Sequence, residues 1–157
     1  GFQRDNFFEA LRPGVLFLLL SAVPLLFYGT RMGRLAVPPT FWLALLLYPL
    51  YGIAQQFALQ ALVTRNLRAL VKARWLRACV TACIFSAAHF PNGPLMGLVF
   101  PAGLVFTWMY EWRPNLWAIG IVPGLLGALV YYLVLGLDPG AELLRPSAVT
   151  SCIAPHG

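Results

Sequence analysis

Long apolar segments joined by short connections are the feature that most constrains this chain. Five of them follow one another, at 13–28, 40–64, 75–90, 94–112 and 116–135. A helix that crosses a bilayer needs roughly 20 predominantly apolar residues, and the third segment is short by that measure. Prolines and glycines interrupt several segments, which membrane helices tolerate because neighbouring helices satisfy the freed backbone groups. The pattern predicts an all-α, polytopic bundle of about five transmembrane helices in contact with the lipid bilayer.

The composition agrees with a protein whose solvent is lipid. Only 10% of the 157 residues are charged, whereas about a quarter are charged in a typical soluble domain. The formal charge of +6 could indicate nucleic-acid binding, but the basic residues lie at the ends of apolar runs, so we expect no nucleic-acid partner. We expect one transmembrane domain over residues 1–140 and a tail over 141–157. No small-residue cleavage site follows the first segment, which we therefore expect to be retained as a helix.

The basic residues also predict an orientation. With five spans, the N-terminal tail and the connections after the second and fourth spans lie on one side of the membrane. That side collects Arg4, Arg12, Arg65, Arg68, Lys72, Arg74, Arg77 and Arg113. The other side has only Arg31, Arg34 and Arg145. The positive-inside rule therefore predicts that the N-terminus and the 65–77 connection are cytoplasmic.

Polar or helix-breaking residues lie at similar depths in three of the predicted spans. At about 1.5 Å of rise per residue, Gln56, His89 and Pro123 lie roughly 12–18 Å from the cytoplasmic ends of their helices. Polar side chains at membrane depth usually face the bundle interior. These positions have the layout of an intramembrane site, whose candidate residues are Gln55, Gln56, Gln60, His89, Asn92 and Pro123.

Each of these features also has a purely structural interpretation. The glutamines could hydrogen-bond to a neighbouring helix, and His89 could hold a structural hydrogen bond near the interface. Small residues allow helices to approach closely, and we expect this packing role for Gly93, Gly97, Gly120, Gly124 and Gly127. Cys79 and Cys83 share a helix face, where they could bind a metal or serve as small buried hydrophobic residues; we expect the latter.

Three motifs, taken in order, resemble those of a known family. The stretch 55–60 reads Gln-Gln-Phe-Ala-Leu-Gln, the stretch 85–89 reads Phe-Ser-Ala-Ala-His, and Pro91-Asn92 follows. They resemble the CPBP family of CAAX prenyl proteases and bacteriocin-processing (Abi-type) intramembrane proteases, whose motifs are Glu-Glu-x-x-x-Arg and Phe-x-x-x-His. The resemblance covers about 51–135. Because the Pro-Asn pair is common in bacterial members, the resemblance implies a bacterial inner-membrane protein.

The sequence departs from the family pattern at the residues on which proteolysis depends in the family. In the family, a glutamate activates water while histidines position it and stabilise the oxyanion. Gln55 and Gln56 stand at the glutamate positions, Gln60 at the arginine and Pro123 at a histidine. A glutamine amide cannot act as a general base. By the depth argument, Glu111 lies at the cytoplasmic edge and cannot substitute.

The resemblance and the departures together predict a non-catalytic binding or scaffold protein, a pseudoenzyme that is an accessory subunit of a larger membrane complex or binds other transmembrane helices. Two alternatives remain open. One is an active intramembrane peptidase in which His89 is the base and Gln56 orients water. The other is tetrapyrrole or pigment binding through His89, since a neutral imidazole can ligate a metal. We expect no cofactor, and no metal site, because one histidine without a nearby carboxylate does not supply three protein ligands.

Overall fold

The fold consists of five continuous helical rods. The computed structural model describes residues 5–36, 38–138 and 141, and all the regular secondary structure within them is helical. The rods are α1 (Phe7–Arg31), α2 (Pro39–Gln56) continuing through η1 (Phe57–Thr64) into α3 (Arg65–Leu70), α4 (Arg74–Ala87), α5 (Gly93–Trp112), and α6 (Leu116–Val130) continuing into η2 (Tyr131–Leu135). The predicted all-α helical bundle is confirmed. The predicted tail, 141–157, lies outside the described residues except for Ala141.

Four of the rods are long and apolar enough to cross a membrane. They are Phe7–Arg31, Pro39–Leu70, Gly93–Trp112 and Leu116–Leu135. Helix α4 has 14 residues, or about 21 Å at 1.5 Å per residue, so it is shorter than a bilayer core of about 30 Å. In the 18-residue apolar stretch of α1, only 17% is buried inside the protein. Such outward-facing apolar surface needs lipid, and the prediction of a multi-pass membrane protein is confirmed.

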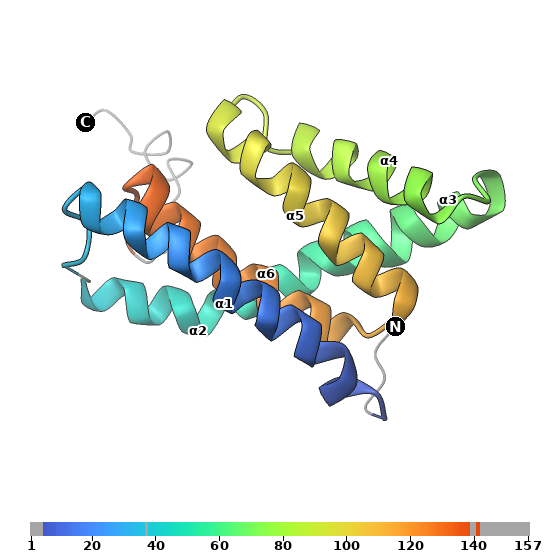
Figure 1. The fold of residues 1–157 in the computed structure, drawn as a ribbon, viewed down its shortest axis with the longest axis horizontal. Helices are drawn as coiled ribbons and strands as arrows, with labels where there is room; N and C mark the ends of the chain where they lie inside the picture. Colours follow the sequence, from blue (N-terminus) through green and yellow to red (C-terminus); the bar gives the residue numbers. More distant parts are fainter. Residues whose placement is uncertain (1–4, 37, 139–140, 142–157) are drawn as a thin grey trace, which may run out of the picture.

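The helices form two groups (Figure 1). Helices α1, α2 and α6 pack together, while α4 and α5 form an antiparallel hairpin beside them. Helix α6 lies at the centre, with buried residues on most of its surface, including Ile119, Val122 and Leu126. Its side chains and those of α5, such as Phe106 and Met109, form a continuous core cluster. The bundle is therefore organised around α6.

Glycines allow α2 and α6 to cross in backbone contact. A Cβ atom added to Gly52 would lie 2.6 Å from the backbone nitrogen of Gly124. A Cβ added to Gly124 would lie 2.7 Å from Cα of Pro49. No side chain fits between these helices, so glycine is required at the crossing. Gly120 meets the backbone of Ile53 in the same way.

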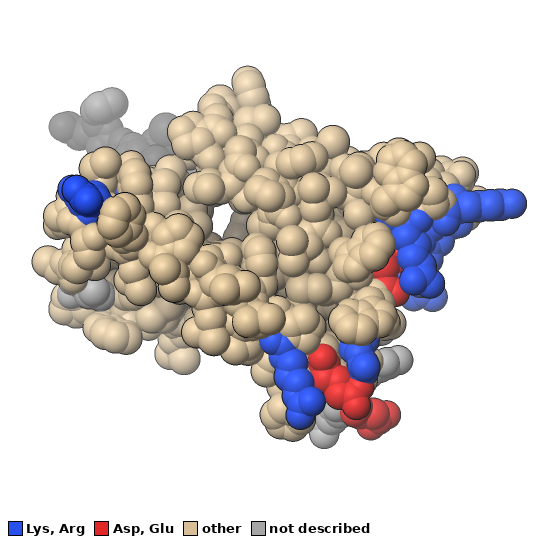
Figure 2. Space-filling model, viewed as in Figure 1, with Lys and Arg blue, Asp and Glu red and all other residues tan. Residues whose placement is uncertain are grey.

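The end of the molecule that carries the start of α1 also carries most of the described basic residues. Glu9 forms an ion pair with Arg113, and Asn115 Nδ2 donates to Asn6 Oδ1 at 2.8 Å. These contacts place the start of α1 beside the α5–α6 connection. Figure 2 shows Lys and Arg side chains gathered at this end, over α3 and the start of α4. Several of the basic residues that the sequence assigned to the predicted cytoplasmic side therefore lie at this end of the described chain.

Candidate functional site

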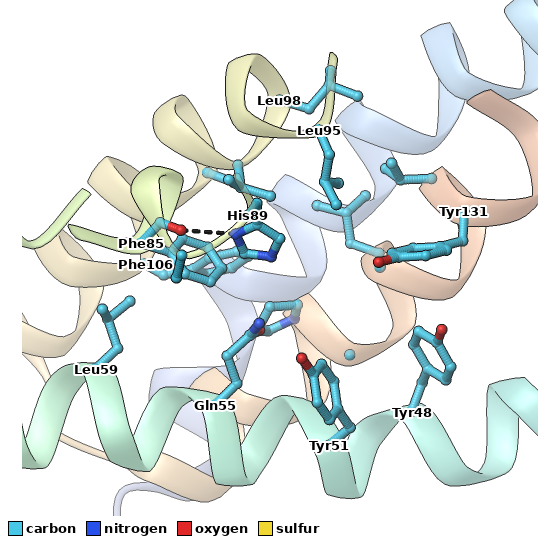
Figure 3. A pocket seen from close by; sticks show the side chains of 18 of the residues that line it. Tyr48, Tyr51, Gln55, Leu59, Phe85, His89, Leu95, Leu98, Phe106 and Tyr131 are labelled. Carbon is cyan, nitrogen blue, oxygen red and sulfur yellow. Dashed lines mark hydrogen bonds between the residues drawn. The ribbon is translucent and has the colours of Figure 1, made fainter. Parts of the chain in front are cut away.

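A cavity of about 760 Å³ lies between the two groups of helices. Its walls come from α2, η1, the end of α4, the start of α5, and α6 with η2. Most of the walls are apolar or aromatic, as expected for a ligand site. Polar atoms reach it from a small set of residues: Tyr48, Tyr51, Gln55, His89, Asn92 and Tyr131. Figure 3 shows Gln55 rising from α2 toward the ring of His89.

His89 lies half-buried at the cavity wall just after α4. Its Nδ1 lies 2.7 Å from the backbone oxygen of Phe85 and, because a carbonyl oxygen only accepts, Nδ1 must carry the proton of this bond. In the neutral ring, Nε2 is then the atom with the free lone pair. The ring of Phe85 stands edge-on to the imidazole, with centroids 4.9 Å apart. These contacts fix both the orientation and the tautomer of His89.

Asn92 and Pro123 contribute to the cavity mainly through the backbone that they shape. The side chain of Asn92 accepts a hydrogen bond from the backbone nitrogen of Leu95 at 3.1 Å, which caps the N-terminus of α5. Capping by asparagine satisfies a backbone donor that the helix leaves free. Pro123 is a buried residue inside α6 and lines the cavity beside Gly124. The proline offers no side-chain proton acceptor where the family motif has a histidine.

The three glutamines have different environments. Gln55 lines the cavity, whereas Gln56 and Gln60 do not and are both fully buried. Gln60 Nε2 donates to Gln56 Oε1 at 3.0 Å. In the motif, these two positions are a glutamate and an arginine. The charged residues of the motif are therefore replaced by a neutral, hydrogen-bonded pair.

The glutamine pair extends into a buried network of threonines. Gln60 Nε2 also donates to Thr107 Oγ1 at 3.1 Å, and Thr64 Oγ1 donates to Gln60 Oε1 at 2.9 Å. Thr64 Oγ1 in turn lies 3.0 Å from Thr81 Oγ1. The network joins the second rod to α4 and α5. Gln56 Nε2 is the one buried side-chain nitrogen or oxygen atom of the described residues without a hydrogen-bond partner.

The backbone under this network is a π-helix, η1. Thr64 Oγ1 also lies 3.2 Å from the backbone oxygen of Leu59, five residues earlier, so its single hydroxyl proton is shared between this oxygen and Gln60 Oε1. π-helical turns are rare and occur frequently at functional sites. Sequence reasoning missed the threonines, although Gln56, Gln60 and Thr64 recur every four residues and so share a helix face. It had no signal for the π-helix or for Thr81 and Thr107.

The carboxylates lie away from the cavity. Glu111 pairs with Arg77 at 2.7 Å and with Arg68 at 3.2 Å, at the basic end of the molecule. Glu9 pairs with Arg113, and Thr40 donates to Asp138 at the opposite end. No carboxylate within the described residues lines the cavity. The same part of the chain contains no group of three His, Cys, Asp or Glu residues that could hold a metal ion.

The glycines and cysteines singled out in the sequence are widely separated. Gly120 and Gly124 lie in the crossing with α2, and a Cβ added to Gly127 would lie 3.6 Å from the ring of Tyr48, which is ordinary contact. A Cβ on Gly93 or Gly97 would meet no atom of the chain within 4 Å. Cys79 is half-buried and Cys83 exposed, and both are free thiols. Cys152 lies outside the described residues.

A family model for type II CAAX prenyl endopeptidases of the Rce1-like kind matches residues 37–129. The chain belongs to this family. The match spans α2 to nearly the end of α6 and includes all the lining residues of the cavity except Val130 and Tyr131. It confirms the resemblance to CAAX prenyl proteases inferred from the motifs. No curated protein and no solved structure matches the chain.

The two glutamines of the network should differ in their effect on stability. Gln60→Leu leaves the Gln56 oxygen and the Thr107 hydroxyl without this partner, while Thr64 keeps its contacts with Leu59 and Thr81. Each buried polar group left unsatisfied costs about 1–3 kcal/mol. Gln56→Leu loses one hydrogen bond and also removes the amide nitrogen that has no partner. We expect Gln60→Leu to lower the free energy of unfolding by about 2 kcal/mol or more, and Gln56→Leu by clearly less.

Unfolding in detergent, followed by circular dichroism, would measure both values. Equal losses, or a larger loss for Gln56→Leu, would show that Gln60 is not the centre of the network.

Proposed function

We propose that this protein is a non-catalytic member of its family that binds an apolar segment of a membrane partner in the cavity. One observation carries the proposal: the cavity contains Gln55 and His89, yet none of the described carboxylates lines it. Cleavage by the family's route needs a group that takes a proton from water. The amide of Gln55 cannot do so, whereas it can donate and accept hydrogen bonds with a bound chain.

The form of the cavity supports a binding role. Its largely apolar walls suit a hydrophobic chain, while Gln55 and the tyrosines Tyr48, Tyr51 and Tyr131 supply a few polar contacts. Pockets that combine apolar walls with a small number of polar groups are typical of binding sites. In this proposal the protein acts as a pseudoenzyme and an accessory subunit of a membrane complex.

The peptidase alternative has one observation in its favour, the His89 Nε2 lone pair at the cavity wall. Gln56, to which this alternative gave the task of orienting water, is fully buried outside the cavity, so Gln55 would have to take that task. A single histidine would then act without an orienting carboxylate, because Nδ1 is bound to a backbone oxygen. The binding role requires none of these additional assumptions.

A cleavage assay separates the two functions. The purified protein, reconstituted in liposomes, is incubated with a farnesylated CAAX peptide, and released fragments are measured by mass spectrometry. We expect no fragment above the level given by His89→Ala, because neither protein has a described carboxylate in the cavity to activate water. Fragments that the unmodified protein releases and His89→Ala does not would contradict the non-catalytic role.

We further propose that the protein lies in a bacterial inner membrane with its N-terminus in the cytoplasm. The support is the gathering of basic residues at the end that contains α3 and the start of α1 (Figure 2), which the positive-inside rule assigns to the cytoplasm. The test uses a variant in which the native cysteines are replaced and one new cysteine is introduced. A cysteine at position 33 should react with a membrane-impermeant maleimide in intact cells. A cysteine introduced at Lys72 should react only after lysis. The reverse labelling would show the opposite orientation.

A further inference from the structure

A second, smaller cavity lies at the basic end of the molecule, away from the one described above. It has a volume of about 260 Å³ and is lined by Arg74, Trp108, Glu111 and Trp112. Arg74 begins α4 and Trp112 ends α5, so the antiparallel hairpin brings them together. Trp108 and Trp112 are four residues apart and therefore share a face of α5. Their exposed fractions are 54% and 64%, which leaves both rings open to a ligand.

Glu111, the only described carboxylate that lines this cavity, is already paired with arginines of the protein. Arg77 binds both oxygens of Glu111, Nε to Oε1 at 3.0 Å and a terminal nitrogen to Oε2 at 2.7 Å. Arg68 adds a contact to Oε1 at 3.2 Å. With two guanidinium groups beside it, Glu111 does not neutralise the remaining cations. The negative charge of Glu111 is already paired with Arg68 and Arg77.

Arg74, in contrast, has no partner among the described residues. It is exposed, and no hydrogen bond or ion pair joins its side chain to another described residue. Arg65 and Lys72 add two exposed positive charges on the same connection. The cavity therefore combines an uncompensated guanidinium with two tryptophan side chains, beside further exposed basic residues.

The position of the cavity indicates what binds there. Trp112 ends a helix long and apolar enough to span the bilayer, and tryptophans at such ends lie at the level of the lipid headgroups. A guanidinium matches the geometry of a phosphate group, and basic pockets at membrane surfaces bind anionic lipid headgroups. We propose that this cavity binds the phosphate of an anionic phospholipid, held by Arg74, with its glycerol and upper acyl chains against Trp108 and Trp112. This inference does not depend on the proposed function of the large cavity.

Native mass spectrometry of the purified full chain would test the proposal. The protein in detergent is mixed with equal amounts of phosphatidylglycerol and phosphatidylcholine, and the retained lipids of each kind are counted. We expect the protein to retain more phosphatidylglycerol. Arg74→Gln should lower the ratio of the two lipids about fivefold, the factor that corresponds to about 1 kcal/mol per basic residue at a membrane surface.

Arg31→Gln is the matched control. Arg31 is also an exposed arginine at a helix end, but it lies at the opposite end of the molecule, over the ring of Phe27. Its loss removes the same charge and should leave the lipid ratio unchanged. Equal effects of both substitutions, or no preference in the unmodified protein, would overturn the proposal, since either result means that no specific site exists.

Two further experiments ask whether a free phosphate compound can replace the lipid and whether the result depends on the folding of Arg74→Gln. Free glycerol phosphate at the same concentration should not displace the lipid, and displacement would show that the acyl chains contribute nothing. Trp112→Ala keeps every charge and removes one wall of the cavity, so it should also lower the ratio. An unchanged ratio in Trp112→Ala would overturn the site even if Arg74→Gln failed to fold.

Discussion

The backbone contact between α2 and α6 is the constraint on which the rest of the structure depends. Gly52 on one helix and Gly120 and Gly124 on the other leave no room for a side chain at the crossing. Without a hydrophobic driving force between helices in lipid, close packing of this kind is a main source of association. The contact also sets the cavity, because Tyr48 and Gln55 of α2 and Pro123 of α6 flank the crossing and line the cavity wall.

The second constraint is the neutral network that joins η1 to α4 and α5. An ion pair at the Gln56 and Gln60 positions would have to overcome the cost of removing two charges from water. The amides and the hydroxyls of Thr64, Thr81 and Thr107 make the same link at a lower desolvation cost. The positions that carry charge in the motif are thus neutral here, and none of the described carboxylates lines the large cavity. A cavity with polar groups but without a described carboxylate is the basis of the proposed binding role.

Much of the fold follows from the sequence because lipid imposes a simple rule. Apolar runs of sufficient length must be helices in a bilayer, and each of the five predicted segments overlaps one rod. Helix α1 begins at Phe7 rather than at 13, and the rod that starts with α2 ends at Leu70 rather than at 64. The depth argument placed Gln56, His89 and Pro123 near one another. His89 and Pro123 line one cavity, together with the further candidates Gln55 and Asn92, whereas Gln56 does not. The depth argument could not separate Gln55 from Gln56, since adjacent residues differ by about 100° around a helix and only packing decides which one faces the cavity.

Other features depend on tertiary contacts that no local pattern encodes. The pairing of Glu111 with Arg77 joins residues 34 positions apart, and the small cavity beside it exists only because α4 and α5 are antiparallel. Likewise, a Cβ at Gly93 or Gly97 would meet open space within the described chain, so the expectation that these glycines pack against partner helices stays a prediction. Helix-packing glycines are recognised by their neighbours, which the sequence of one helix does not contain.

The central claim, that the large cavity holds a segment of a membrane partner, is tested most directly by photo-cross-linking in native membranes. A benzophenone amino acid is placed at Gln55 in the cavity or, as a control, at Leu46, which lies on the same helix, does not line the cavity and is 72% exposed. The account predicts that position 55 forms an adduct with one discrete protein, while position 46 yields lipid adducts. Lipid adducts alone at both positions, or the same proteins at both, would contradict it.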